Sequence, residues 1–356
     1  MKTEQLEGKV QTVLGLVDAE QIGITTCHEH ILWDMSHYFL EPSSATDREM
    51  ARQPVSSDNL WWVRAHAAGN KDDIRQTDEQ LAVSECLRFK AAGGGTIVEL
   101  TLDGICRDPL GLARVARATG LNIIMGSGYY SSFSHPDDMD KKNEEEIVEE
   151  IVREIAEGVR ETGVRAGIIG EIGCSVPFTQ NEHKVLRASA MAQRRTGAPI
   201  NVHPSINDEL VIKNIEILED AGADLSHVAI SHVDGYEFSL STLHKILKAG
   251  CYVEYDGFGH TMYHQIYMGR VINEGNDIQR IYDIQRLIDD GYINQILLGQ
   301  DVFFKCSLAA YGGFGYAHII DNLIPLMRAK GMTESQIQTL LVENPKRFLR
   351  FAPPSS

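Results

Sequence analysis

The sequence predicts a (β/α)8 barrel, and three observations support this fold class. Eight short apolar segments recur along the chain, and each is followed by a segment with the apolar spacing of an amphipathic helix. Parallel strands need such crossover connections, because a tight turn cannot join them. The typical barrel of about 250 residues leaves room for a long first loop, a long seventh loop and terminal extensions. Metal-binding side chains end several of the apolar segments, and barrel active sites lie at that end of the strands.

The predicted strands are short and apolar. The first runs from Ile24 to Leu32 and contains the segment TCHEH at 26–30. The other seven are predicted at residues 96–102, 122–125, 166–172, 199–203, 227–232, 251–256 and 295–301. A weakly alternating segment at about 8–20 precedes them, and we interpret it as a short N-terminal strand or hairpin.

Helices are predicted between these strands from the spacing of their apolar positions. The predicted ranges are 77–92, 109–119, 144–162, 180–196, 209–221, 240–248 and 278–290, with a helical C-terminal extension at about 318–351. The glycines at 93–95 are a stop signal for the first helix. Residues 41–70 are expected to form a long loop with some helix. We expect these elements to form a single barrel domain that spans residues 1–356.

An open, doubly wound sheet is the alternative arrangement for alternating strands and helices. That fold usually carries a glycine-rich phosphate turn after its first strand. In this sequence, His28, Glu29 and His30 take that place. The barrel is therefore favoured.

Composition excludes some classes of partner. The chain has 33 Lys and Arg against 50 Asp and Glu, a net charge of −17, so its surface should repel nucleic acid and anionic membranes. No apolar segment approaches the length that crosses a bilayer. The six cysteines have no CxxC spacing, and we expect all six to be reduced and buried. We therefore expect a cytoplasmic protein that acts on a small molecule.

The segment around His28 and His30 has the chemistry of a metal site. Alternate residues of a strand face the same side, so both imidazoles should point into one cavity. Further metal-binding side chains end later strands: Glu171, His203, His232 and Asp301. Four imidazoles and two carboxylates exceed the needs of one zinc ion, and they suit two metal ions that share a bridging carboxylate and a bridging hydroxide.

Each of these residues also has a structural interpretation. A histidine at a strand end is often a satisfied structural residue, an aspartate there often caps the next helix, and Glu171 could pair with an arginine. Their joint placement at successive strand ends is what favours a metal site.

Several longer motifs carry a family resemblance. They are GKVQTVLG at 8–15, TCHEH at 26–30, GGGTIVELTLDGICRDP at 93–109, GIIGEIGCS at 167–175, INVHPS at 200–205, SHVDG at 231–235, GCYVEYDGFG at 250–259 and LLGQD at 297–301. Through them the chain resembles the phosphotriesterase family of the amidohydrolase superfamily, and within it the branch of phosphotriesterase-related proteins. The resemblance spans essentially the whole chain.

The resemblance implies an assignment of the ligands. It implies a more buried metal ion held by His28, His30 and Asp301, and a more exposed one held by His203 and His232.

Glu171 departs from the archetypal phosphotriesterases, in which a carboxylated lysine bridges the metals. Residues 166–175 contain no lysine, and Glu171 resembles the bridging residue of the related branch. This departure removes the need for CO2 and speaks against efficient phosphotriester hydrolysis.

The resemblance also implies catalytic roles for three residues. Asp301 would accept the proton of the bridging hydroxide. Asp234 would relay that proton outward, although a cap of a loop or helix is an equally open interpretation. Tyr130 matches a tyrosine that lactonase relatives place near the hydroxide, and a role as pocket wall is also open.

The sequence gives fewer indications about the substrate pocket than about the metal ligands. Lactonase relatives carry an arginine after the aspartate of strand seven, whereas Asp256 is followed by Gly257, so lactone specificity is not supported. The loop residues that could line the pocket, with loop packing as the simpler interpretation of each, are Trp61, Trp62, Phe258, His260, Tyr263 and His264.

We therefore predict a metal-dependent hydrolase in which a bridging hydroxide attacks a small carboxylic amide or ester. The cofactors are two divalent metal ions, with Zn2+ as the first choice and Mn2+, Co2+ or Fe2+ as alternatives. Hydrolysis of a phosphotriester or a lactone is the alternative activity. A non-catalytic ligand-binding barrel is a third hypothesis, which the complete ligand set disfavours. A homodimer is the expected assembly.

Overall fold

The computed structural model describes residues 6–236, 238–260, 265–267, 270–272 and 275–355. Eight parallel strands form one sheet in the order β14-β11-β10-β9-β8-β7-β6-β3. The two outer strands of this order meet, because the backbone N–H of Asp301, just after β14, donates to the carbonyl oxygen of His28 in β3 at 2.9 Å. The predicted (β/α)8 barrel is therefore confirmed.

The barrel strands lie within the predicted segments or within two residues of them. Their bounds are β3 Ile24–Glu29, β6 Gly94–Glu99, β7 Asn122–Ser127, β8 Ile168–Gly173, β9 Ile200–His203, β10 Val228–Ile230, β11 Tyr252–Tyr255 and β14 Ile296–Leu298. Strand β6 includes Gly94 and Gly95, which the sequence analysis took as part of the stop signal before a strand that begins at residue 96. A Cβ atom on Gly95 would lie 2.2 Å from the carbonyl oxygen of Ile22, so the close approach to the chain before β3 requires glycine.

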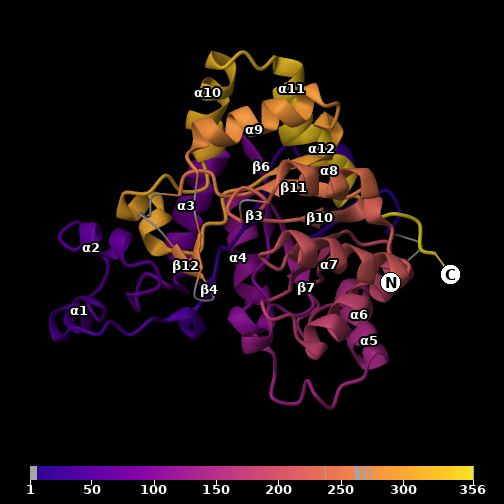
Figure 1. Ribbon diagram of the computed structural model, residues 1–356, viewed down its shortest axis with the longest axis horizontal. Coiled ribbons are helices and arrows are strands. Elements are labelled where there is room, and N and C mark those ends of the chain that lie inside the picture. Colours follow the sequence, from indigo (N-terminus) through magenta and orange to yellow (C-terminus); the bar gives the residue numbers. More distant parts are fainter. Residues whose placement is uncertain (1–5, 237, 261–264, 268–269, 273–274, 356) are drawn as a thin grey trace.

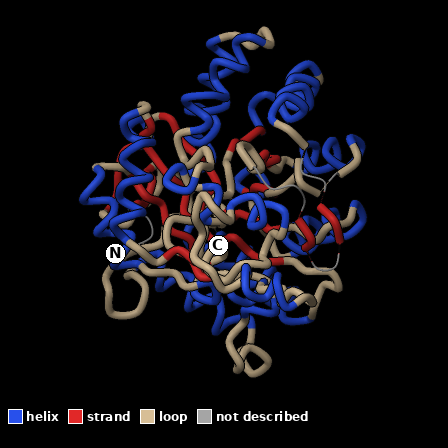
Figure 2. The backbone as a smooth tube through the Cα atoms, turned by 90° about the vertical axis from the view of Figure 1, so that its left-hand side faces the viewer, coloured by secondary structure: helices blue, strands red, loops and turns tan. Residues whose placement is uncertain are grey.

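Helices surround the strands, as Figures 1 and 2 show. The helices between barrel strands are α3 Glu79–Ala91, α4 Pro109–Thr119, α5 Glu144–Ala156, α6 Gln180–Thr196, α7 Asp208–Asp220, α8 Leu240–Ala249 and α9 Asp277–Asp289. All seven begin after a side chain that accepts a backbone N–H of the first turn: Asp78, Asp108, Asn143, Thr179, Asn207, Ser239 and Asn276. Such caps fix where each crossover leaves the barrel rim.

Helix α5 is shorter than the predicted range of 144–162. It ends at Ala156, because Gly158 and Arg160 adopt φ angles of 122° and 50°, which a helix cannot contain. The N–H of Val159 then donates to the carbonyl oxygen of Val164 at 2.8 Å and turns the chain toward β8.

The terminal segments cover the N-terminal end of the barrel. Strands β1 Lys9–Thr12 and β2 Gly15–Asp18 form an antiparallel hairpin. The C-terminal extension contains α10 Ile324–Ala329, α11 Glu334–Gln338 and α12 Asn344–Leu349. Val10 and Phe348 pack with Ile168 and Tyr252, the first residues of β8 and β11. This apolar packing closes the N-terminal end of the barrel, so the C-terminal end is the one available for an active site.

Two long loops extend the C-terminal end. The first, between β3 and α3, contains β4 Trp33–Asp34, α1 Ala45–Met50, α2 Leu60–Ala65 and β5 Arg75–Gln76, so the prediction of a loop with some helix is confirmed. The seventh contains an antiparallel pair, β12 Gln265–Tyr267 and β13 Arg270–Ile272, which the sequence did not predict. In Figure 1 the first loop projects from the barrel at the left.

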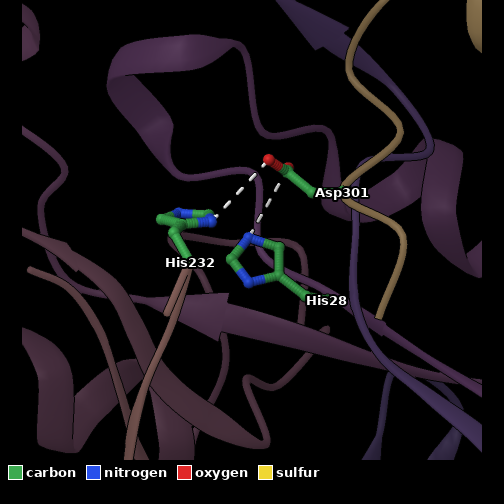
Figure 3. A group of neighbouring side chains, drawn as sticks. All are labelled: His28, His232 and Asp301. Carbon is green, nitrogen blue, oxygen red and sulfur yellow. Dashed lines mark ion pairs between the residues drawn. The ribbon is translucent and has the colours of Figure 1, made fainter. Parts of the chain in front are cut away.

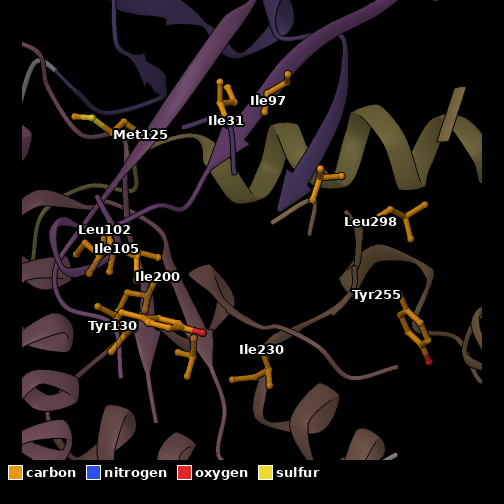
Figure 4. Packing of buried hydrophobic residues seen from close by; sticks show 14 of the residues in the cluster. Ile31, Ile97, Leu102, Ile105, Met125, Tyr130, Ile200, Ile230, Tyr255 and Leu298 are labelled. Carbon is orange, nitrogen blue, oxygen red and sulfur yellow. The ribbon is translucent and has the colours of Figure 1, made fainter. Parts of the chain in front are cut away.

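The core lies between the strands and the surrounding helices. Figure 4 shows part of it, including Ile97 on β6, Ile200 on β9 and Ile230 on β10. Burying one such side chain stabilises the fold by about 1.5–3 kcal/mol. The barrel is therefore a rigid support for the residues at its rim.

Two expectations about surface and membrane can be compared with the structure. All six cysteines are free, but Cys106 is exposed, so the prediction that all six are buried is wrong. Cys106 lies at the end of a short turn with a φ of 78°, outside the strands and helices of the barrel.

In the described ranges, no helix has the length and apolar character needed to cross a bilayer.

Candidate metal centre

The six predicted ligands are buried together at the C-terminal end of the barrel. His28 lies in β3, Glu171 in β8 and His203 ends β9. His30, His232 and Asp301 come one to three residues after the ends of β3, β10 and β14. The parallel sheet thus gathers side chains from five strands at one rim.

Glu171 connects two groups of possible ligands. One group contains His28, His30 and Glu171, and the other contains Glu171, His203 and His232, with the donor atoms of each group within 4.8 Å of one another. Glu171 Oε2 lies 2.7 Å from His203 Nδ1, 2.8 Å from His232 Nε2 and 3.6 Å from His28 Nε2. A carboxylate in this position faces both halves of the site, the half with His28 and His30 and the half with His203 and His232.

Asp301 closes the site from the opposite side. Its Oδ1 lies 3.2 Å from His30 Nε2 and 3.7 Å from His28 Nε2, and its Oδ2 lies 3.9 Å from His232 Nδ1. Figure 3 shows His28 and His232 converging on this carboxylate. Asp301 therefore contacts imidazoles of both halves.

Two of the six residues have strained backbones. His232 and Asp301 adopt φ angles of 55° and 47°, in the left-handed region that non-glycine residues rarely occupy. Such strain is retained where a side chain must point in one direction, and it is frequent at functional sites. Here it accompanies the turn of both side chains toward Glu171 and His28.

The donor atoms fit divalent metal ions. His28 Nε2 is buried and makes no hydrogen bond to any described residue. His203 Nδ1 and His232 Nε2 lie 2.9 Å apart, so two ring nitrogens and Glu171 Oε2 meet at one point. A cation placed among these atoms satisfies all of them, and imidazole with carboxylate suits zinc, manganese, cobalt and iron.

The electrostatics of the site favour ionised carboxylates. Burial would raise the pKa of Glu171, but the charges of His203 and His28 outweigh it and hold this pKa well below its usual range. Burial likewise opposes ionisation of Asp301, and a hydrogen bond from His30 together with the charge of His28 lowers its pKa. Both carboxylates are therefore ready to bind cations.

Four further residues orient the imidazoles, and the sequence did not reveal them. His28 Nδ1 lies 3.1 Å from Glu254 Oε2 and 3.2 Å from Asp256 Oδ2. His232 Nδ1 lies 3.0 Å from Asp256 Oδ1. The remaining contacts join His30 Nδ1 to Thr101 Oγ1 at 2.9 Å, and His203 Nε2 to the Tyr236 hydroxyl at 2.9 Å. Metal-binding histidines almost always have such a partner on their second nitrogen.

One signal in the sequence pointed to two of these residues. Glu254 and Asp256 alternate within the buried segment CYVEYD, and a buried carboxylate needs a polar partner. Tyr236 had no comparable signal, because its contact with His203 depends on how the loop after β10 folds.

Asp234 and Tyr130 both lie beside the site. The Asp234 carboxylate accepts a hydrogen bond from the N–H of Gly257 at 3.0 Å and pairs with Arg280. The Tyr130 hydroxyl lies 3.3 Å from His203 Nδ1 and accepts a hydrogen bond from the Tyr38 hydroxyl at 2.8 Å. The catalytic roles of both residues stay predictions.

A cavity lies over the candidate ligands. Its walls combine apolar side chains with polar groups: Met35, Tyr38, Ala68, Ile74, Tyr130, Asp234, Tyr236, His260, Arg280, Phe303 and Phe304. Of the predicted pocket residues, His260 lines this cavity.

The other predicted pocket residues do not take that position where the structure describes them. Trp61 is 70% exposed on the surface, and Trp62 and Phe258 are buried in loop packing. Tyr263 and His264 lie outside the described residues.

Comparisons with known proteins identify the family of this chain. The model of the phosphotriesterase family matches residues 8–349. An N-acetyltaurine hydrolase from Xenopus tropicalis is 39% identical, over 97% of this chain and 99% of its own. A phosphotriesterase-related protein from Nematostella vectensis is 37% identical with the same coverage. The crystal structure of a resiniferatoxin-binding protein from Rhodobacter sphaeroides superposes with a TM-score of 0.93 at 34% identity, over 98% of each chain.

The family match covers nearly the whole chain, and the predicted resemblance is confirmed. The named relatives and the ligand geometry support the same class of chemistry. The chain therefore belongs to the phosphotriesterase family and is a hydrolase.

Proposed function

We propose that this hydrolase uses a binuclear metal centre to cleave a small carboxylic amide. The observation that carries the proposal is the position of Glu171, which belongs to one group of possible ligands with His28 and His30 and to another with His203 and His232. A single-metal site would have no use for a carboxylate between two pairs of imidazoles. Two sites that share one carboxylate are the arrangement used by hydrolases with paired metals.

The residues divide between the two ions as the sequence resemblance implied. His28, His30 and Asp301 would hold one ion and His203 and His232 the other, with Glu171 shared. When bound, the pair of divalent cations supplies an acidified water nucleophile and polarises the scissile carbonyl.

The chain's own residues manage the proton. Asp301 is the proposed proton acceptor for the attacking water, because its carboxylate faces His28, His30 and His232 and so borders both halves of the centre. The lowered pKa of Asp301 keeps its carboxylate ionised, and only the ionised form can accept a proton. The leaving amine must gain a proton, and Asp301 would return it to the amine nitrogen.

Tyr130 and Asp234 take supporting roles in this proposal. The Tyr130 hydroxyl borders His203 and the cavity, where it would orient the substrate carbonyl. Asp234 would relay a proton only by releasing Arg280 or the backbone N–H of Gly257. Its role as an anchor of the loop after β11 is therefore the better supported interpretation.

The relatives favour an amide as substrate. Proteins 37–39% identical to this chain over nearly their whole length are named N-acetyltaurine hydrolases, and such a reaction cleaves a small N-acyl group from an amine. Apolar residues Met35, Ala68, Ile74 and Phe303 provide a wall for the uncharged part of such a substrate. We propose a small N-acyl amine as the substrate, Zn2+ as the metal, a homodimer as the assembly and the cytoplasm as the location.

A substrate panel tests the proposal. The protein would be loaded with Zn2+, Mn2+ or Co2+ and assayed with N-acetyltaurine, N-acetyl amino acids, p-nitrophenyl esters, lactones and paraoxon. We expect the highest kcat/KM on an N-acetyl amine. Turnover confined to paraoxon or to lactones would replace the amide with the alternative substrates. An absence of turnover on every N-acyl compound would also refute the amide assignment.

A further inference from the structure

We infer that Asp256 is a positioning residue shared by both halves of the metal centre, so that one carboxylate fixes an imidazole of each proposed ion. This inference rests on the proposed binuclear function. It concerns a residue outside the six proposed ligands, which acts through His28 and His232.

The contacts of Asp256 use both of its oxygens. Asp256 Oδ2 lies 3.2 Å from His28 Nδ1, and Asp256 Oδ1 lies 3.0 Å from His232 Nδ1. The backbone N–H of His232 also donates to Oδ2 at 2.9 Å. The ring and backbone N–H groups of His232 donate to this buried carboxylate, and the ring N–H of His28, which hydrogen-bonds to Glu254, also lies within ion-pair distance of it. The two histidines come from the first and sixth strands of the barrel.

These contacts determine which ring nitrogens face the metals. A carboxylate can only accept, so Asp256 selects the tautomer with hydrogen on Nδ1 in His232, and Asp256 and Glu254 together select it in His28. The Nε2 lone pairs of His28 and His232 then face Glu171 Oε2, at 3.6 Å and 2.8 Å. Asp256 therefore prepares one ligand in each half of the centre.

Asp256 is itself held from behind. The backbone N–H of Asp256 donates to Asp234 Oδ1 at 3.3 Å, and that of Gly257 donates to Asp234 Oδ2 at 3.0 Å. Arg280 on α9 pairs with the same Asp234 oxygen. The end of β11 is therefore fixed by a buried ion pair, which gives Asp256 a defined direction.

Glu254 offers a matched comparison, because it contacts only one of the two histidines. Its Oε2 lies 3.1 Å from His28 Nδ1 and also accepts from Asn201 at 2.7 Å and Ser231 at 2.8 Å. Its Oε1 has no hydrogen-bond partner among the described residues. A glutamine can keep its oxygen toward these donors, whereas an asparagine at 256 must turn its NH2 group toward an N–H donor.

The test is a zinc titration of the full chain against a chromophoric chelator, starting from metal-free protein. Wild type, Asp256→Asn and Glu254→Gln are compared through their two stepwise dissociation constants, with the d–d absorption of Co2+ as a second readout. Loss of an orienting partner typically costs about 10–100-fold in metal affinity. We expect Asp256→Asn to raise both constants by such factors, and Glu254→Gln to raise one constant by less.

The possible outcomes separate the inference from the proposed function. If Asp256→Asn raises only one constant, or if both variants behave alike, Asp256 is not shared and the inference fails. A wild type that binds fewer than two ions refutes the binuclear function itself. Should Asp256→Asn not fold, Asp256→Glu replaces it: the carboxylate is kept but displaced by one methylene, and both constants should again rise.

Discussion

Replacement of Asp301 by asparagine tests the proposed proton acceptor, and it keeps one oxygen for the metal ion that this residue is also proposed to hold. The amide keeps an oxygen that can face His30 Nε2, which lies 3.2 Å from Asp301 Oδ1, and it keeps the size of the side chain. It removes the group that can take a proton. General acid–base groups contribute about 10²–10⁴-fold to rate. At about 1.36 kcal/mol per tenfold change, the barrier should rise by about 2.7–5.5 kcal/mol.

The assay is kcat on the best substrate of the panel, with the metal content of each preparation measured in parallel. The matched control is Asp321→Asn, the same substitution at an exposed aspartate that is not among the candidate ligands, and it should retain wild-type kcat. We expect Asp301→Asn to lose at least a hundredfold in kcat while it still binds metal. Wild-type kcat in this variant would remove Asp301 from the mechanism.

Three further predictions concern stability and metal. Glu154 pairs with Arg107 at 2.7 Å in the interior, so Glu154→Leu should lower the free energy of unfolding in urea by about 3–5 kcal/mol. Adding Arg107→Met to that variant should restore part of the loss. Additive losses from the two substitutions would argue against coupling. Burial raises the pKa of Asp73 from 3.8 to about 6, so the folded state binds this proton more tightly than the unfolded chain. The free energy of unfolding should therefore fall as pH rises from about 4 to 6, by about 3 kcal/mol, and Asp73→Asn should remove that slope; parallel pH profiles would contradict it. Chelation of the metal ions should abolish turnover and lower Tm, because a ligand at a thousand times its Kd stabilises the folded state by about 4 kcal/mol. Added Zn2+ should restore both turnover and Tm. An unchanged Tm would count against a tightly held centre.

The fold and the ligands could be predicted because both follow from repeated local patterns. Eight apolar segments with intervening helices permit few topologies, and parallel strands bring their C-terminal ends to one rim. His28, His203 and Asp301 each lie within three residues of a strand end, so their convergence followed from the barrel alone.

The residues that sequence reasoning missed depend on contacts between distant segments. Asp256 acquires its role from His28 and His232, which are 228 and 24 positions away along the chain. Trp61 and Trp62 are aromatic residues of the kind that line pockets, but α2 places Trp61 on the surface and Trp62 in the interior. Helix α5 was predicted too long because Gly158 takes a left-handed conformation that apolar spacing cannot reveal.

The central claim is that two metal ions share Glu171. Anomalous diffraction from crystals grown with Zn2+, recorded on both sides of the zinc absorption edge, tests it most directly. The expected result is two peaks at the C-terminal end of the barrel, one beside His28 and His30 and one beside His203 and His232, with Glu171 bound to both. A single peak, or two peaks that Glu171 does not bridge, would contradict the binuclear centre.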